Sequence, residues 1–244
     1  MTPNLLAYVL WLFTGLFLIG TLLCLALYKW DAVRYFKSQL WIKTYYWIPI
    51  FCLFLGVNYG QLLAALLAVL VVSSLSIREL YKLPARPWYA VAYTSIILAS
   101  ITHLPLFFIQ FSQTMAAMLL LIVGFSSVLS DVCAYFFGNF IGRHKLPNWI
   151  NPNKSWEGVA GQLIGACVGF ILIAPAFDQA PSVILAVAIG LASAFGDILN
   201  SIVKRQLGIK DWGMTIPGHG GMLDRFASLA FAIAATYWFA KLLL

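Results

Sequence analysis

The residues most able to do chemistry in this chain lie in a short segment near its C-terminal end. Between two long apolar runs, residues 201–225 contain lysine and arginine side chains, a histidine, an Asp-Arg pair and two neighbouring glycines. Glycine lets the backbone approach a ligand closely, cations bind phosphate oxygens, and carboxylates bind divalent metals. So polar a stretch beside apolar spans is costly unless it has a function. The segment therefore predicts a phosphate-handling site at a membrane surface.

The polar residues of this segment follow a recognisable order. They are Ser201, Lys204, Arg205, Lys210, Asp211, His219, Gly220, Gly221, Asp224 and Arg225. Their types and spacing resemble the signature of the phosphatidate cytidylyltransferases, also called CDP-diacylglycerol synthases. That signature has one further aspartate at its end, and this chain has Ala227 at the corresponding position. The segment therefore has one acidic residue fewer than the family pattern.

A second block of residues, upstream of the first, is also similar to this family. Its members are Asp131, Ala134, Tyr135, Gly138, Gly142, Lys145, Lys154, Ser155, Trp156, Glu157 and Gly158. Together the two blocks span residues 131–228, and two such spacings rarely occur together by chance. The first half of the chain shows only membrane character.

The resemblance implies an enzyme that condenses CTP with phosphatidic acid, giving CDP-diacylglycerol and pyrophosphate. It implies that Asp224 is a magnesium ligand, with Asp197 holding the same ion from a second element, and such oxygen ligands suit Mg²⁺. A phosphate monoester is already ionised at neutral pH, so its oxygen attacks the α-phosphorus of CTP without a general base. His219 is therefore expected to donate a hydrogen bond to a phosphate or to shape the glycine-rich loop.

Expected roles follow from residue type. The residues expected to act in catalysis are Asp197, Asp224, Lys204, Arg205, Lys210, Asp211, His219 and Arg225. Those expected to bind substrate are Asp131, Tyr135, Lys154, Ser155, Glu157, Asn200, Ser201, Gly220 and Gly221. The cations would offset charge that develops on phosphate oxygens. Asp224, Ser155 and Glu157 have a structural alternative, because each is also suited to cap the N-terminus of a helix.

The composition shows which elements must position these residues. Hydrophobic residues make up 62% of the chain and charged residues 9%, with a mean hydropathy of +0.91, which excludes an ordinary soluble domain. A helix needs about 17–25 apolar residues to span a bilayer. Eight stretches qualify, near residues 5–27, 40–57, 60–77, 87–104, 114–138, 158–177, 182–203 and 225–244. We expect an all-α integral membrane protein with about eight spans and a polar catalytic cavity at the cytoplasmic side.

The basic residues alternate between the gaps that separate these spans. All but one of the 15 lysines and arginines fall in every second gap, the exception being Lys241. By the positive-inside rule these gaps are cytoplasmic and both termini face away from the cytoplasm. The catalytic loops are thus expected on the cytoplasmic side of a multi-pass protein of a bacterial-type inner (plasma) membrane.

Two predicted spans carry a polar face. The span near residues 182–203 bears, at spacings of three or four residues along one face, Asp197, Asn200, Ser201 and Lys204. The polar end of the span near 114–138 bears Ser127, Ser130, Asp131 and Tyr135. A carboxylate in a span is costly unless it is paired or liganded. The alternative to a ligand role for Asp197 is a salt bridge with Lys204 or Arg205. Both faces are expected to line one wet cavity.

Other functions are weighed against this one. The acceptor could be another lipid phosphate or a polyprenol, or the chain could be a catalytically weakened paralogue. A transporter fits less well, because transporters place charges near mid-span and often contain repeats. The net charge of +7 does not indicate nucleic acid, because the basic residues sit in short loops beside lipid headgroups.

The expected partners are CTP, phosphatidic acid, membrane lipid and Mg²⁺ as cofactor, with no nucleic acid. A homo-oligomer is left open. The chain divides into N-terminal transmembrane helices, residues 1–112, and a C-terminal catalytic region that carries both motif blocks, residues 113–244. The two parts are alternatively one continuous domain.

Overall fold

The computed structural model describes residues 2–177, 182–216 and 220–243. Its elements are α1 (Pro3–Leu27), α2 (Ala32–Phe36), α3 (Gln39–Tyr81), α4 (Trp88–Ile101), α5 (His103–Gln110), α6 (Gln113–Phe140), α7 (Trp156–Ile173), the 3₁₀ turn η1 (Ala174–Ala176), α8 (Val183–Gln206) and α9 (Met222–Leu243). Within the described ranges there is no β-strand, only two isolated β-bridges, Lys145–Ser155 and Ile216–Gly220. The prediction of an all-α multi-pass membrane protein is confirmed.

Helix α3 makes two passes rather than one. Seven of the described helices are long and apolar enough to cross a membrane, but α3 has 43 residues, about twice what a span needs. Its backbone turns at Gln61, where φ is 51° and ψ is −133°. Gln61 accepts a hydrogen bond from Gln113 at the start of α6 (3.0 Å), whereas Glu79 lies against the start of α9 at the opposite end of the bundle. The described chain therefore makes eight passes, as predicted.

The predicted span limits agree with the helices to within a few residues, with two differences. The gap predicted near Asn58 is helical, and the chain turns at Gln61 instead. The span predicted to end at residue 104 continues through α5 to Gln110. Pro105 lies in the first turn of α5, where its missing N–H group would have no helical partner in any case.

Helices α6 and α7 are held unusually close by a row of glycines on α7. A side-chain carbon at Gly165 would lie 2.2 Å from the carbonyl oxygen of Leu129, and one at Gly169 would lie 2.6 Å from that of Phe125. Small residues at such spacing let two membrane helices approach backbone to backbone. This contact brings Asp131 on α6 and the start of α7 to the same end of the bundle.

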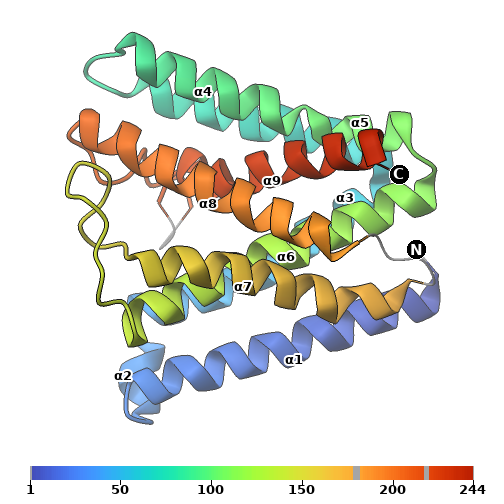
Figure 1. The fold of residues 1–244 in the computed structure, drawn as a ribbon, viewed down its shortest axis with the longest axis horizontal. Helices are drawn as coiled ribbons and strands as arrows, with labels where there is room; N and C mark the ends of the chain where they lie inside the picture. Colours follow the sequence, from blue (N-terminus) through green and yellow to red (C-terminus); the bar gives the residue numbers. More distant parts are fainter. Residues whose placement is uncertain (1, 178–181, 217–219, 244) are drawn as a thin grey trace.

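Helices α8 and α9 meet in a similar way nearer the loops. A side-chain carbon at Gly196 would lie 2.4 Å from the carbonyl oxygen of Ala227, and Ala227 itself is fully buried. Both chain termini lie at one end of the molecule, and the loops after α6 and α8 lie at the other (Figure 1). The two motif blocks therefore share one end of the bundle, which we call the loop end.

Candidate active site

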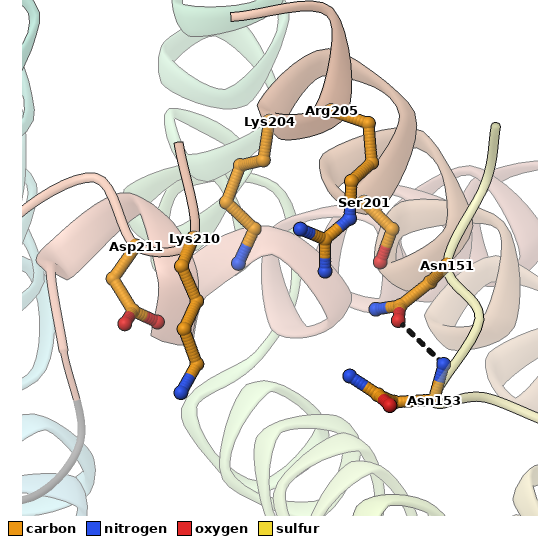
Figure 2. A pocket seen from close by; sticks show the side chains of 7 residues that line it. All are labelled: Asn151, Asn153, Ser201, Lys204, Arg205, Lys210 and Asp211. Carbon is orange, nitrogen blue, oxygen red and sulfur yellow. Dashed lines mark hydrogen bonds between the residues drawn. The ribbon is translucent and has the colours of Figure 1, made fainter. Parts of the chain in front are cut away.

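A small cavity of about 190 Å³ opens at the loop end. It is lined by Asn151, Asn153, Ser201, Lys204, Arg205, Lys210 and Asp211. Figure 2 shows the nitrogen ends of Lys204 and Arg205 pointing into the space between the end of α8 and the loop after α6. Among the lining residues three cations outnumber one carboxylate, an arrangement suited to an anion with several oxygen atoms. Five of the seven lining residues are predicted site residues, and the two asparagines are not.

Asp224, in the first turn of α9, is a deeply buried acidic group of this site. Its side chain is 1% exposed, and its Oδ1 atom lies 2.5 Å from the Nζ atom of Lys204. Its Oδ2 atom accepts hydrogen bonds from the backbone N–H groups of Trp212 (2.8 Å) and Gly221 (3.0 Å). Asp224 therefore ties α8, the loop after α8 and α9 together and caps the start of α9 through Gly221 N, and its expected role as a metal ligand stays a prediction.

Asp197 is paired with a residue that the sequence pattern did not suggest. Its Oδ2 atom lies 3.1 Å from Lys154 Nζ and accepts a hydrogen bond from Gln162 Nε2 (2.9 Å). Lys154 comes from the second motif block, 43 residues earlier. The alternative of a salt bridge with Lys204 or Arg205 is wrong, because α7 and the loop before it lie on the side of α8 that carries the Asp197 carboxylate.

Asp131 extends the polar region into the bundle. The Ser228 hydroxyl on α9 donates a hydrogen bond to its Oδ2 atom (3.3 Å). Its Oδ1 atom is buried and has no hydrogen-bond partner among the described residues. A buried carboxylate oxygen without a partner is costly, so this atom is available to a ligand, a water molecule or an ion.

Ser155 and Glu157 organise the start of α7. Ser155 is the N-cap and accepts a hydrogen bond from Gly158 N (3.1 Å), so the capping alternative for Ser155 is confirmed. The Glu157 carboxylate, in the first turn of α7, also holds the preceding loop, at 2.6 Å from His144 Nδ1 and 3.1 Å from His144 N. Both residues shape the loop that carries Asn151 and Asn153 to the cavity.

Gly220 and Gly221, both predicted site residues, lie close to carboxylate groups of the protein. Gly220 has φ of 86°, and a side-chain carbon there would lie 3.1 Å from Asp224 Oδ2 and 3.4 Å from Asp211 Oδ1. A side-chain carbon at Gly221 would lie 2.7 Å from Glu79 Oε2. Larger residues would therefore displace these acids.

Several predicted residues lie beside the cavity rather than in its lining. Asn200 is buried and accepts a hydrogen bond from Trp212 Nε1 (2.8 Å), while the Trp212 ring stacks on Tyr93. Tyr135 and Arg225 have exposed side chains. His219 lies outside the described residues.

The described residues contain no cluster of three His, Cys, Asp or Glu side chains arranged to hold a metal ion. Mg²⁺ often needs only one or two carboxylates, because substrate phosphates and water complete its coordination. Asp197 meets that requirement, because its contacts with other described side chains all end on Oδ2 and leave Oδ1. Asp224 uses both oxygens for Lys204 and the backbone, so a metal at Asp224 would compete with Lys204.

Glu79 on α3 is a residue of this region that sequence reasoning missed. It is 2% exposed and binds the start of α9 through two backbone N–H groups. The signal that could have identified it is its charge, because Glu79 is one of only eight acidic residues and it ends a long apolar run. Sequence reasoning also missed Gln162, the hydrogen-bond donor to Asp197, because a single glutamine in a span does not indicate a role.

Comparisons with known proteins show which proteins this chain is similar to. The family described as "Cytidylyltransferase family" matches residues 3–243. A phosphatidate cytidylyltransferase of Thermotoga maritima is 34% identical over 66% of this chain and 63% of its own length. Two proteins of the same name are also similar. The one from Brucella suis is 40% identical over 46% of this chain and 43% of its own length. The one from Mycobacterium leprae is 46% identical over 40% of this chain and 32% of its own length. The chain thus matches less than two thirds of the length of these relatives.

Proposed function

The chain belongs to the cytidylyltransferase family, and on that premise we propose that it transfers a cytidylyl group from CTP to phosphatidic acid. The products are CDP-diacylglycerol and pyrophosphate. Relatives from several bacteria carry the name phosphatidate cytidylyltransferase. The observation that carries the proposal in this chain is the cavity in which Lys204, Arg205 and Lys210 converge beside two asparagines.

The reaction requires little covalent chemistry from the protein. An ionised phosphate oxygen of the lipid forms a bond to the α-phosphorus of CTP while the bond from that phosphorus to the bridging oxygen of pyrophosphate breaks. The leaving pyrophosphate takes the electron pair. Catalysis of such a transfer rests on positioning and on compensating the charge of phosphate oxygens.

The cavity residues suit these two tasks. The charges of Lys204, Arg205 and Lys210 compensate those of the triphosphate, and the Arg205 guanidinium can hold two oxygens at once. Asn151 and Asn153 offer amide groups that both donate and accept hydrogen bonds. Asp224 keeps the Lys204 ammonium in place through their 2.5 Å contact.

We propose Mg²⁺ as the cofactor, with Asp197 and Asp224 as its protein ligands. When bound, the ion would offset charge on the phosphates of the nucleotide. Asp197 suits this role through its uncommitted Oδ1 atom, and Asp131 Oδ1 is a further acidic oxygen nearby. Asp224 would join the metal only by exchanging its contact with Lys204, which would free that ammonium for a phosphate.

We also propose that the loop end faces the cytoplasm. The loops and helix ends there carry all but one of the 15 basic residues, and Lys241, the exception, lies in the last turn of α9. Positive residues favour the cytoplasmic side. In this proposal CTP enters the cavity from the cytoplasm. Phosphatidic acid reaches the cavity from the adjoining leaflet of a bacterial-type inner membrane. The division into residues 1–112 and a catalytic region 113–244 stays a prediction.

The direct test is to incubate purified protein in detergent with labelled CTP, Mg²⁺ and phosphatidic acid, and to follow cytidine in the lipid fraction. We expect lipid-linked cytidine and an equal amount of pyrophosphate. Another lipid phosphate and a polyprenol serve as alternative acceptors. Labelling of one of these in place of phosphatidic acid would contradict the proposed substrate, and labelling of none would contradict the proposed reaction.

A matched pair of lysine variants tests the cavity itself. Lys210→Gln removes a cavity cation and should lower kcat/KM at least about 10-fold, because one charged hydrogen-bond donor is lost. Lys241→Gln removes a cation at the opposite end and should leave kcat/KM unchanged. Equal effects of the two variants would show that the cavity does not bind the nucleotide.

A further inference from the structure

Glu79 is a buried carboxylate that joins the first half of the chain to the motif segment of residues 201–225. It lies near the C-terminal end of α3 and is 2% exposed. Its Oε1 atom accepts hydrogen bonds from the Thr215 hydroxyl (2.5 Å) and from Met222 N (2.7 Å). Its Oε2 atom accepts one from Leu223 N (3.0 Å). Glu79 therefore binds the loop after α8 and the first turn of α9 at the same time.

The charge of Glu79 is compensated by the end of a helix. No ion pair to Glu79 forms among the described residues, and an uncompensated buried carboxylate would cost several kcal/mol. The N-terminus of α9 supplies the compensation, because its first N–H groups lack helical partners and carry partial positive charge. The N–H group of Gly221, just before α9, also lacks a helical partner and donates a hydrogen bond to Asp224. Carboxylates of the protein thus fill the place where a helix N-terminus would otherwise bind an anion.

The backbone at Gly213 and Gly221 approaches this carboxylate closely. A side-chain carbon at Gly213 would lie 3.3 Å from Glu79 Oε1, and one at Gly221 would lie 2.7 Å from Glu79 Oε2. Glycine at both positions lets the backbone on either side of the loop reach the carboxylate. A larger residue at Gly221 would force the two apart.

Asp224 depends on this anchor. It directly follows Leu223, whose N–H group Glu79 binds. It also holds the Lys204 ammonium at 2.5 Å, and Lys204 lines the cavity. A continuous set of contacts therefore runs from Glu79 through the first turn of α9 to a cavity cation.

We infer that Glu79 is a positioning residue for cytidylyl transfer: by anchoring the loop at residues 213–215 and the start of α9, it sets the position of Asp224 and, through it, of Lys204. The inference rests on the proposed function for its catalytic consequence. Its structural part, the anchoring of α9, is measurable without any activity.

The test compares Glu79→Gln with Ser76→Ala. Glutamine keeps the size of the side chain but replaces one acceptor oxygen with an NH₂ group that faces N–H and O–H donors, so at least one hydrogen bond to a charged acceptor is lost. Ser76 lies one turn earlier on α3, is fully buried, and its hydroxyl has no hydrogen-bond partner among the described residues. It therefore controls for a small change inside the same helix.

We expect Glu79→Gln to lower kcat by about 10- to 100-fold, the size of losing one hydrogen bond to a charged group, with an unchanged KM for phosphatidic acid. Hydrogen–deuterium exchange at the Met222 and Leu223 amides should accelerate at least about 10-fold. Ser76→Ala should match wild type in both measurements. Thr215→Val, at an exposed residue, removes one donor without removing the charge and should give a smaller loss of kcat in a fully folded protein.

A second readout separates positioning from plain stabilisation. If Glu79 acts through Lys204, the effects of Glu79→Gln and Lys204→Met on kcat should be less than additive in the double variant. Additive effects, or a wild-type kcat in folded Glu79→Gln protein, would overturn the inference. Unchanged exchange at Met222 and Leu223 would overturn it as well. A wild-type protein that transfers no cytidylyl group would contradict the proposed function instead, and the exchange data alone would then decide whether Glu79 anchors α9.

Discussion

Replacing Asp224 by asparagine would break the most buried ion pair of the described residues. The side chains of Asp224 and Lys204 are 1% and 16% exposed, and their charged atoms are 2.5 Å apart. Removing one partner of a buried pair leaves an uncompensated charge and typically costs about 3–5 kcal/mol. Asp197→Asn breaks a pair whose side chains are 27% and 33% exposed, where solvent screening limits the cost to about 1 kcal/mol or less. The two variants should therefore differ clearly in stability.

Thermal unfolding in detergent measures this difference. At about 2–4 °C per kcal/mol for a chain of this size, Asp224→Asn should lower Tm by roughly 6–20 °C and Asp197→Asn by no more than about 4 °C. Both should abolish cytidylyl transfer if both acids serve the nucleotide and its metal.

The double variant with Lys204→Met provides the control for Asp224→Asn. It removes the unpaired Lys204 ammonium together with the Asp224 carboxylate, so it should regain most of the lost stability without regaining activity. If Asp224→Asn unfolds at the wild-type temperature, the pair contributes nothing to the fold and the role assigned to Asp224 is wrong.

Three further perturbations test other parts of the structure. Gly165→Ala should lower the free energy of unfolding by about 1–3 kcal/mol in a denaturant titration, because its methyl group would lie 2.2 Å from the Leu129 carbonyl oxygen. Gly15→Ala is the control and should be neutral, because no atom lies within 4 Å of the added carbon. Equal effects of the two variants would exclude the close α6–α7 contact. Cysteines introduced at residues 210 and 241 should react with an impermeant reagent from opposite faces of sealed vesicles, and reaction from one face would refute the eight-pass arrangement. Ala227→Asp buries an added carboxylate, so its Tm should rise with Mg²⁺ far more than that of wild type, and a Tm insensitive to Mg²⁺ would show that no ion reaches this position.

Much of the architecture follows from local properties of the sequence. The length of each apolar run and the alternation of basic gaps predicted the helices, the eight passes and the end at which the motifs meet, because hydropathy and charge act residue by residue along the chain. The face shared by Ser201 and Lys204 followed from helical periodicity alone. The position of Asp224 at the start of its helix followed from the limits of the last apolar run.

Only the tertiary structure decided which charges are partners. Asp197 pairs with Lys154 rather than with its neighbours on α8, because glycines hold α7 against α6 and the loop before α7 lies beside α8. Glu79 meets Met222 across 143 residues because α3 turns back at Gln61 and returns to the loop end. Such pairings depend on how helices approach one another through close-packed surfaces, and no periodicity or spacing within one segment contains that information.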